Sequence, residues 1–135
     1  MALGVIHPTR QHTPHACALA SLAMVIGRDY QEVYRQAEKF YGERLKEGVY
    51  RHQMFRLARW FDVPLKEQKP FELDEHEGIL YVARRRACYH AVVLFNGSIY
   101  DPLDGNFYEP GTHLESFGKV TRARYTALLV KEQGD

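Results

Sequence analysis

The chain has 135 residues, of which 45% are hydrophobic and 26% are charged, and its formal net charge is +1. This composition is ordinary for a globular protein, and the length fits a single domain over residues 1–135. Because binding to a phosphate backbone needs an excess of positive charge, the near-neutral balance argues against a nucleic-acid partner.

The N-terminal stretch MALGVIHPTR has no basic lead and only a short apolar run. It therefore does not read as a secretory signal or a membrane anchor, and we expect no membrane span and a cytoplasmic location. The two cysteines allow at most one internal disulfide, and in a reducing compartment both are expected as free thiols. Both thiols are then available for chemistry.

The first half of the chain has the periodicity of helices. Thr13 as N-cap and Pro14 at the first helical position precede an apolar run that ends at Gly27, which predicts a first helix. Two further helices are predicted over 30–41 and about 50–61, because apolar residues recur there at helical spacing.

After the third helix the pattern changes to that of strands. Four short runs rich in branched and aromatic residues predict them: GILYVARR, CYHAVVLF, SIYD and RYTALLVK. The segment GNFYEPGTHLESFGK is expected to be mostly loop, with a turn of helix after Thr112. Helices in one half and an antiparallel sheet in the other predict an α+β fold.

Asn96 and Gly97 form the strongest hairpin signal in the chain, because a type I′ turn needs positive φ at both central residues. With these two as the loop, strand alternation places His90 and Asp101 on one face as diagonal neighbours, roughly 7 Å apart at Cβ. An imidazole and a carboxylate can meet there. The same register points Asp104 to the opposite face, so Asp104 is the weaker candidate partner.

Cys17 is expected in the first turn of the first helix. Unpaired backbone N–H groups and the positive end of the helix dipole lower the pKa of a thiol there, and a protonated His90 would lower it further. A histidine held by a carboxylate beside such a thiol is the arrangement of a nucleophilic site. Gln11, upstream on the chain, offers a side-chain amide for an oxyanion, and the Cys17 backbone N–H offers a second donor.

Gln11, five intervening residues, Cys17 opening the helix CALASLAM, and the distant YHAVVLFNGSIYDP together resemble the papain-like cysteine peptidases. They are most similar to the double-glycine leader peptidases that process bacteriocin precursors in bacteria, and to their stand-alone relatives. The resemblance implies that Gln11 builds the oxyanion hole, Cys17 attacks the carbonyl, His90 acts as general base and then acid, and Asp101 orients His90. It also implies a peptide or protein substrate and no cofactor. The family usually has glycine where this chain has Ala18.

Each candidate has a structural alternative. A cysteine on an apolar helix is more often packing, a histidine on an apolar strand is more often a satisfied core residue, and an Asp-Pro pair is more often a plain turn. The combination of Cys17, His90 and Asp101 favours catalysis over these alternatives. The second hypothesis is a binding module that keeps the papain-like fold without turnover, in a regulatory or phage-encoded protein. Peptide cleavage, deamidation and transamidation all remain open.

A zinc site is the remaining rival. Its possible ligands are His7, His12, His15, Cys17, and His52 or His90. No CxxC or HExxH spacing fixes a geometry, so we expect no metal, and we expect His12 and His15 at the rim of the active cleft.

Two other features lie beside the histidine strand. Cys88 is expected to share a face with His90 but lacks a helix terminus that would stabilise a thiolate, so it is interpreted as sheet packing. The run Arg84 to Arg86 predicts a solvated turn, or a surface that selects acidic groups of the substrate.

Overall fold

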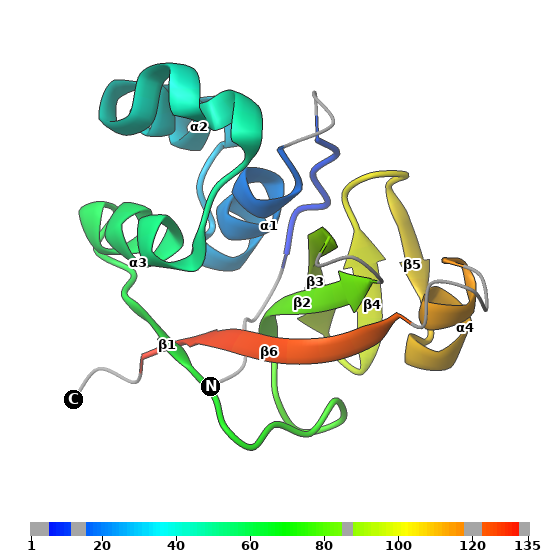
Figure 1. Ribbon diagram of the computed structural model, residues 1–135. Coiled ribbons are helices and arrows are strands. Elements are labelled where there is room, and N and C mark those ends of the chain that lie inside the picture. The colour runs from blue at the N-terminus through cyan, green and yellow to red at the C-terminus, as the bar shows by residue number, and fades with distance from the viewer. Residues whose placement is uncertain (1–5, 12–15, 85–87, 118–122, 133–135) are drawn as a thin grey trace.

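The computed structural model describes residues 6–11, 16–84, 88–117 and 123–132 (Figure 1). Helices come first along the chain, and strands follow. The helical elements of the first half are α1 (Cys17–Ile26), α2 (Tyr30–Tyr41), the 3₁₀ helix η1 (Gly42–Glu47) and α3 (Arg51–Trp60). The three predicted helices are therefore confirmed.

The second half forms a sheet whose strand order is β1-β6-β2-β3-β4-β5. Its strands are β1 (Leu65–Glu67), β2 (Gly78–Arg84), β3 (Cys88–Phe95), β4 (Ser98–Asp101), β5 (Asn106–Tyr108) and β6 (Arg124–Lys131). The paired strands are antiparallel. A short helix, α4 (Pro110–Glu115), lies between β5 and β6 in the chain. Among the described residues, no helix has the length and apolar character to cross a bilayer.

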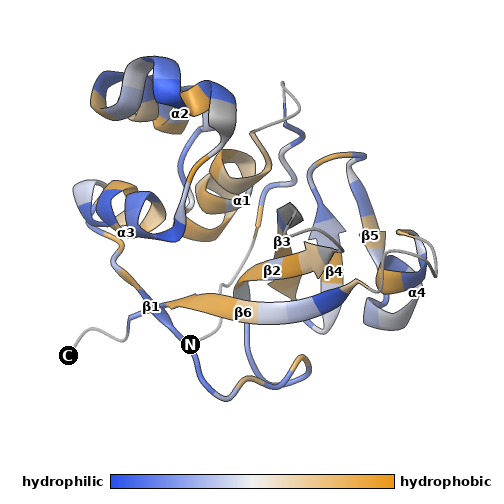
Figure 2. Cartoon of the chain, in the orientation of Figure 1, coloured by the Kyte–Doolittle hydropathy of each residue, from blue (hydrophilic) through white to orange (hydrophobic). Residues whose placement is uncertain are grey.

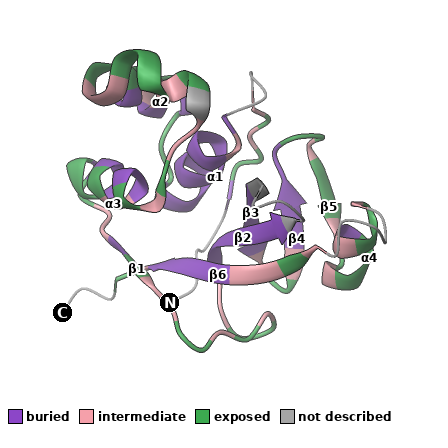
Figure 3. Ribbon diagram, in the orientation of Figure 1, coloured by how far each residue is buried: buried purple, intermediate pink, exposed green. Residues whose placement is uncertain are grey.

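The helix α1 is the central helix of the fold. Every residue from Ala18 to Ile26 is buried, as expected for a helix that is apolar all round. It lies between the other two long helices and the sheet (Figures 1 and 3). The predicted start was wrong: Ala16 is the N-cap and the helix begins at Cys17, while Thr13 and Pro14 lie outside the described residues. Gly27 ends the helix in a left-handed conformation with φ 74°, as predicted.

The hairpin between β3 and β4 has the predicted register. Leu94 pairs with Ile99, and the loop residues Asn96 and Gly97 have φ of 51° and 77°. These positive values are those of the expected turn. The strand β4 ends at Asp101, and this short length places Asp101 at the corner where the chain leaves the sheet.

Apolar side chains of β2 and β3 alternate between the two faces of the sheet, so both faces are apolar. Figure 2 shows most of β2 in the colours of hydrophobic residues. One face, with Ile79 and Val93, packs against the helices α1 to α3. The other face, with Leu80 and Val92, is covered in part by Leu114 of α4 and the residues around it. We call these the helical face and the α4 face.

Two short strands and the extent of α4 were not predicted. The strand β5 occupies 106–108, where a loop was expected, and β1 adds a strand at the far edge of the sheet. Three residues are too few to show an alternating pattern, and both strands exist because a neighbouring strand pairs with them.

Candidate active site

Cys17 is the first residue of α1, a half-buried, free cysteine. One turn further, the buried Ser21 hydroxyl donates a hydrogen bond of 3.2 Å to the backbone oxygen of Ala91 on β3. This bond ties the start of the helix to the residue that follows His90. The packing of α1 therefore brings the thiol to the middle of β3.

The environment of Cys17 favours its thiolate. Burial by itself would raise the pKa of the thiol, because a thiolate loses solvation inside the protein. A hydrogen bond with His90 and the positive charge of that imidazole act in the opposite direction, and backbone hydrogen bonds with Ala91 and Ala18 add to them. Together these contacts hold the pKa of Cys17 below its ordinary value.

His90 links the thiol to a carboxylate. Its Nε2 lies 2.7 Å from Oδ1 of Asp101, and the two residues are 6% and 4% exposed. Because Nε2 faces Asp101, Nδ1 is the ring nitrogen left to meet Cys17. Burial would lower the pKa of His90, but the bonds to Asp101 and Cys17 and their negative charges raise it to about 9. The imidazole is thus suited to hold a proton beside a thiolate.

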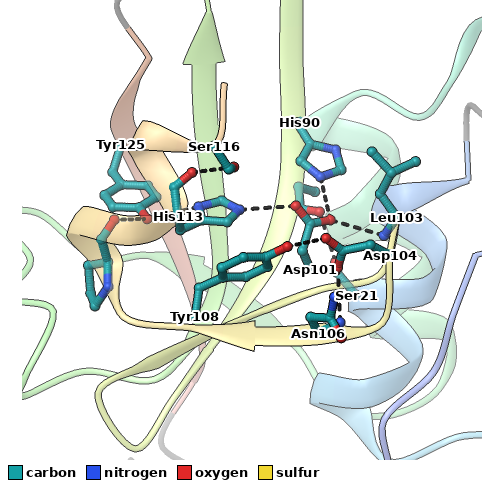
Figure 4. A network of polar contacts seen from close by, with 12 residues as sticks. Ser21, His90, Asp101, Leu103, Asp104, Asn106, Tyr108, His113, Ser116 and Tyr125 are labelled. Atoms are coloured by element: carbon teal, nitrogen blue, oxygen red, sulfur yellow. Dashed lines mark hydrogen bonds and ion pairs between the residues drawn. The ribbon is translucent and has the colours of Figure 1, made fainter. Parts of the chain in front are cut away.

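Asp101 is held as a carboxylate by several donors (Figure 4). Its Oδ1 accepts the backbone N–H of Leu103 at 2.9 Å in addition to His90, and its Oδ2 lies 3.0 Å from Nε2 of His113. Burial would raise the pKa of Asp101, but the hydrogen bonds from His113 and His90 keep it well below its usual range.

The sequence interpretation missed His113, which is wholly buried. It lies on α4, and its Nδ1 is 2.9 Å from the hydroxyl of Tyr125 on β6, which donates to the backbone oxygen of Pro110 at 3.1 Å. No local pattern marks a histidine in a short helix as a partner of a distant strand residue. Only the packing of α4 on the sheet brings the two together.

Gln11 lies in an extended segment beside the Asp101 corner. Its backbone N–H donates to the oxygen of Pro102 at 3.0 Å. It also lines a cavity of about 630 Å³ that continues to Met24 and Tyr30. The structure thus ties Gln11 to the site through the backbone next to Asp101. That the side-chain amide of Gln11 binds an oxyanion stays a prediction.

Tyr81 on β2 is a second residue that the sequence interpretation missed. Burial raises the pKa of its phenol, the nearby Arg51 guanidinium opposes this, and the negative charge of Cys17 raises it further. Tyr81 lines a cavity of about 300 Å³ with Val49, Tyr50 and Arg51. Tyr81 belongs to the apolar cluster of the helical face, against which Cys17 also packs.

The other candidates lie apart from this cluster. Asp104 is exposed in the turn after β4 and accepts hydrogen bonds from Tyr108 and Asn106. It does not sit opposite β3 as predicted, because β4 ends before it. His7 and His52 are exposed.

No cluster that could hold a metal ion exists among the described residues. Several predictions fall outside what the structure describes and stay untested. They concern His12, His15, Arg85, Arg86 and the side chains of Arg84 and Cys88.

Comparison with known proteins supports this fold. No family model and no curated protein matches the chain by sequence. A solved structure of a double glycine motif protease from an AMS/PCAT transporter, in complex with the leader peptide, is similar to it with a TM-score of 0.61 and 20% identity. The match covers 98% of this chain and 95% of that chain. The chain therefore has the α+β, papain-like fold of that protease, as the resemblance predicted.

Proposed function

We propose that the protein is a cysteine peptidase, or a related thiol-dependent amide hydrolase or acyl transferase, that acts on a peptide or protein. The observation that carries this proposal is the continuous set of contacts from Cys17 through His90 to Asp101. It combines a thiol of lowered pKa with a buried imidazole of raised pKa. These are the two properties that a nucleophile and its general base need.

The reaction is a two-step acyl transfer. Cys17 and His90 rest as a thiolate and an imidazolium, and the thiolate attacks the carbonyl carbon of the substrate. The oxyanion that forms is held by the Cys17 backbone N–H and the amide of Gln11. His90 then gives its proton to the leaving amine, and it later removes a proton from the water that hydrolyses the thioester. Asp101 holds the ring of His90 in place throughout.

The fold and the site support a peptide or protein as the substrate. The similar protease binds a leader peptide, which supports a peptide substrate for this chain as well. The cavity of about 300 Å³ beside Tyr81 offers room for a substrate side chain. We propose a cytoplasmic location, where reducing conditions keep such a thiol free.

The proposal is tested by the reactivity of the two thiols. We expect iodoacetamide to label Cys17 much faster than Cys88 near neutral pH, because His90 stabilises the thiolate of Cys17. Mass spectrometry of the labelled peptides gives both rates. Equal, slow labelling of both cysteines would instead favour the silent binding module.

Turnover is tested with a cellular peptide extract, whose cleavage products are read by mass spectrometry. We expect Cys17→Ala to abolish processing while the fold is preserved, and Cys88→Ala to leave it intact. The Cys17→Ala variant also serves as a trap that retains its substrate for identification. Products that persist unchanged in Cys17→Ala would rule out the thiol mechanism.

A further inference from the structure

Asp101 has two histidine partners, and the mechanism above uses one of them. Oδ1 faces Nε2 of His90 at 2.7 Å, and Oδ2 faces Nε2 of His113 at 3.0 Å (Figure 4). His113 is 0% exposed and packs edge-on against Phe117 and parallel to the ring of Tyr125. Because the imidazole is buried and has a hydrogen-bond partner at each nitrogen, its position beside Asp101 is fixed.

The hydrogen bonds around His113 allow its protons to be counted. Nε2 must carry a hydrogen, because the Asp101 carboxylate can only accept. The Tyr125 hydroxyl has one hydrogen, and its contact with the backbone oxygen of Pro110 is a hydrogen bond only if this hydroxyl donates, because a carbonyl oxygen can only accept. The 2.9 Å contact between that hydroxyl and Nδ1 is then a hydrogen bond only if Nδ1 is the donor. All the contacts are satisfied when His113 has a hydrogen on both ring nitrogens.

We propose that His113 is a positioning residue for the Cys17–His90 pair: as a resident imidazolium anchored by Tyr125, it holds Asp101 in place and offsets part of its negative charge. The effect on turnover rests on the proposed function, but the protonation of His113 does not. Charges then alternate along the buried contacts, with a thiolate, an imidazolium, a carboxylate and a second imidazolium.

This alternation has a physical reason. A buried charge loses its solvation, and a neighbouring opposite charge offsets much of that cost, whereas an unpaired buried charge keeps all of it. With His113 charged, Asp101 has a counterion even when His90 has lost its proton during the reaction. Within the part of the chain that the structure describes, the phenols of Tyr100, Tyr108 and Tyr125 also feel the charge of the Asp101 carboxylate. The exposed carboxylate of Asp104 bonds to the hydroxyl of Tyr108.

The first test counts the protons directly. NMR of the full protein, labelled with ¹⁵N-histidine, gives the shifts of both ring nitrogens of His113 at neutral pH. We expect both nitrogens to have the shifts of protonated imidazolium nitrogens. One protonated and one unprotonated nitrogen would overturn the proposal.

The second test separates the effect of the positive charge on His113 from the effect of its hydrogen bond to Asp101. His113→Gln keeps an N–H donor for Asp101 but removes the positive charge, so the titration midpoint of His90 should rise from about 9 by about one pH unit. A neutral His113 that only supports Asp101 predicts no rise, or a fall if Asp101 loosens. An unchanged or lowered midpoint would therefore overturn the proposal.

Two further variants complete the design. Tyr125→Phe removes the oxygen that faces Nδ1 of His113 and should move the His90 midpoint in the same direction by less, so it replaces His113→Gln if that variant does not fold. Tyr108→Phe removes a phenol that packs near His113 but bonds to Asp104, and it should move nothing. A midpoint that moves equally in both phenylalanine variants contradicts the proposal.

These results are independent of the proposed function. If Cys17 is labelled slowly but the His90 midpoint rises in His113→Gln, the proposed peptidase function is rejected and the protonated state of His113 is supported. If Cys17 is labelled rapidly but the His90 midpoint does not change, the peptidase function is supported and the charge on His113 is rejected.

Discussion

The helical face and the α4 face of the sheet are held together by different forces. On the helical face, α1 is buried among apolar side chains, and its one buried polar side chain, Ser21, bonds to β3. On the α4 face, a set of buried polar groups (His90, Asp101 and His113) forms beside an apolar cluster. The nucleophile is thus positioned by packing and its base by hydrogen bonds. Substitutions on the two faces should therefore fail in different ways.

The largest expected effect is a loss of activity on the α4 face. Asp101→Asn replaces the carboxylate that holds the proton of His90, and the pKa of His90 should fall. An amide can also present an N–H to Nε2, which would favour the wrong tautomer of the ring. We expect kcat/KM to fall by about 10²–10⁴-fold.

The matched control for this change is Asp104→Asn, which alters an exposed carboxylate that does not bond to His90. It should leave kcat/KM unchanged. Steady-state kinetics on the peptide identified with the Cys17→Ala trap measures both variants. An equal loss of kcat/KM in the two variants would show that Asp101 has no specific role in catalysis.

The second prediction concerns stability against pH, where Cys17 and His90 act in opposite directions. His90 contributes stability that is complete below its unfolded pKa near 6.5 and is lost as pH rises through its folded value of about 9. Cys17 contributes stability that is complete above its unfolded pKa near 9 and is lost as pH falls through its lowered folded value. Between the lowered folded pKa of Cys17 and pH 9 the two slopes oppose each other, so the free energy of unfolding should change less with pH there than either group alone would make it.

Cys17→Ser removes the pH dependence that the thiol contributes to stability and leaves the one that His90 contributes. Asp101 still holds the proton of His90, so this variant should lose on the order of 1–3 kcal/mol between about pH 6.5 and 9. Asp101 does not disturb the comparison, because its lowered pKa makes its contribution complete above about pH 4. Urea unfolding at a series of pH values measures both proteins, and parallel curves would show that the thiol and the imidazole are not coupled.

The third prediction tests the helical face. Leu22→Ala on α1 removes a fully buried side chain and should lower the free energy of unfolding by about 2–5 kcal/mol. Below the unfolding transition, the pH at which Cys17 labels should stay close to that of the wild type, because the bonds of His90 and Asp101 are untouched. A large shift of the labelling pH would show that packing also sets the electrostatics of the site.

The two faces also differ in how far they could be predicted. The apolar composition of α1 predicted a buried helix, and Asn96 with Gly97 predicted the register that brings His90 to Asp101, because both signals are local. His113 could not be found this way, since it reaches Asp101 only through the packing of α4 against a strand distant in the sequence. The start of α1 was misplaced for a related reason: Thr13 and Pro14 are typical of a helix start, but the helix begins only at Cys17.

The smallest expected effect lies where the two faces meet. Ser21→Ala removes the hydrogen bond from α1 to the backbone oxygen of Ala91 and leaves a buried oxygen with one donor fewer. We expect the free energy of unfolding to fall by about 1 kcal/mol. Because the same bond sets how closely the start of α1 approaches β3, the labelling rate of Cys17 should also fall several-fold. Ser21→Thr, which keeps the hydroxyl, is the control. If Ser21→Ala loses stability but keeps the full labelling rate, apolar packing alone is enough to place the thiol.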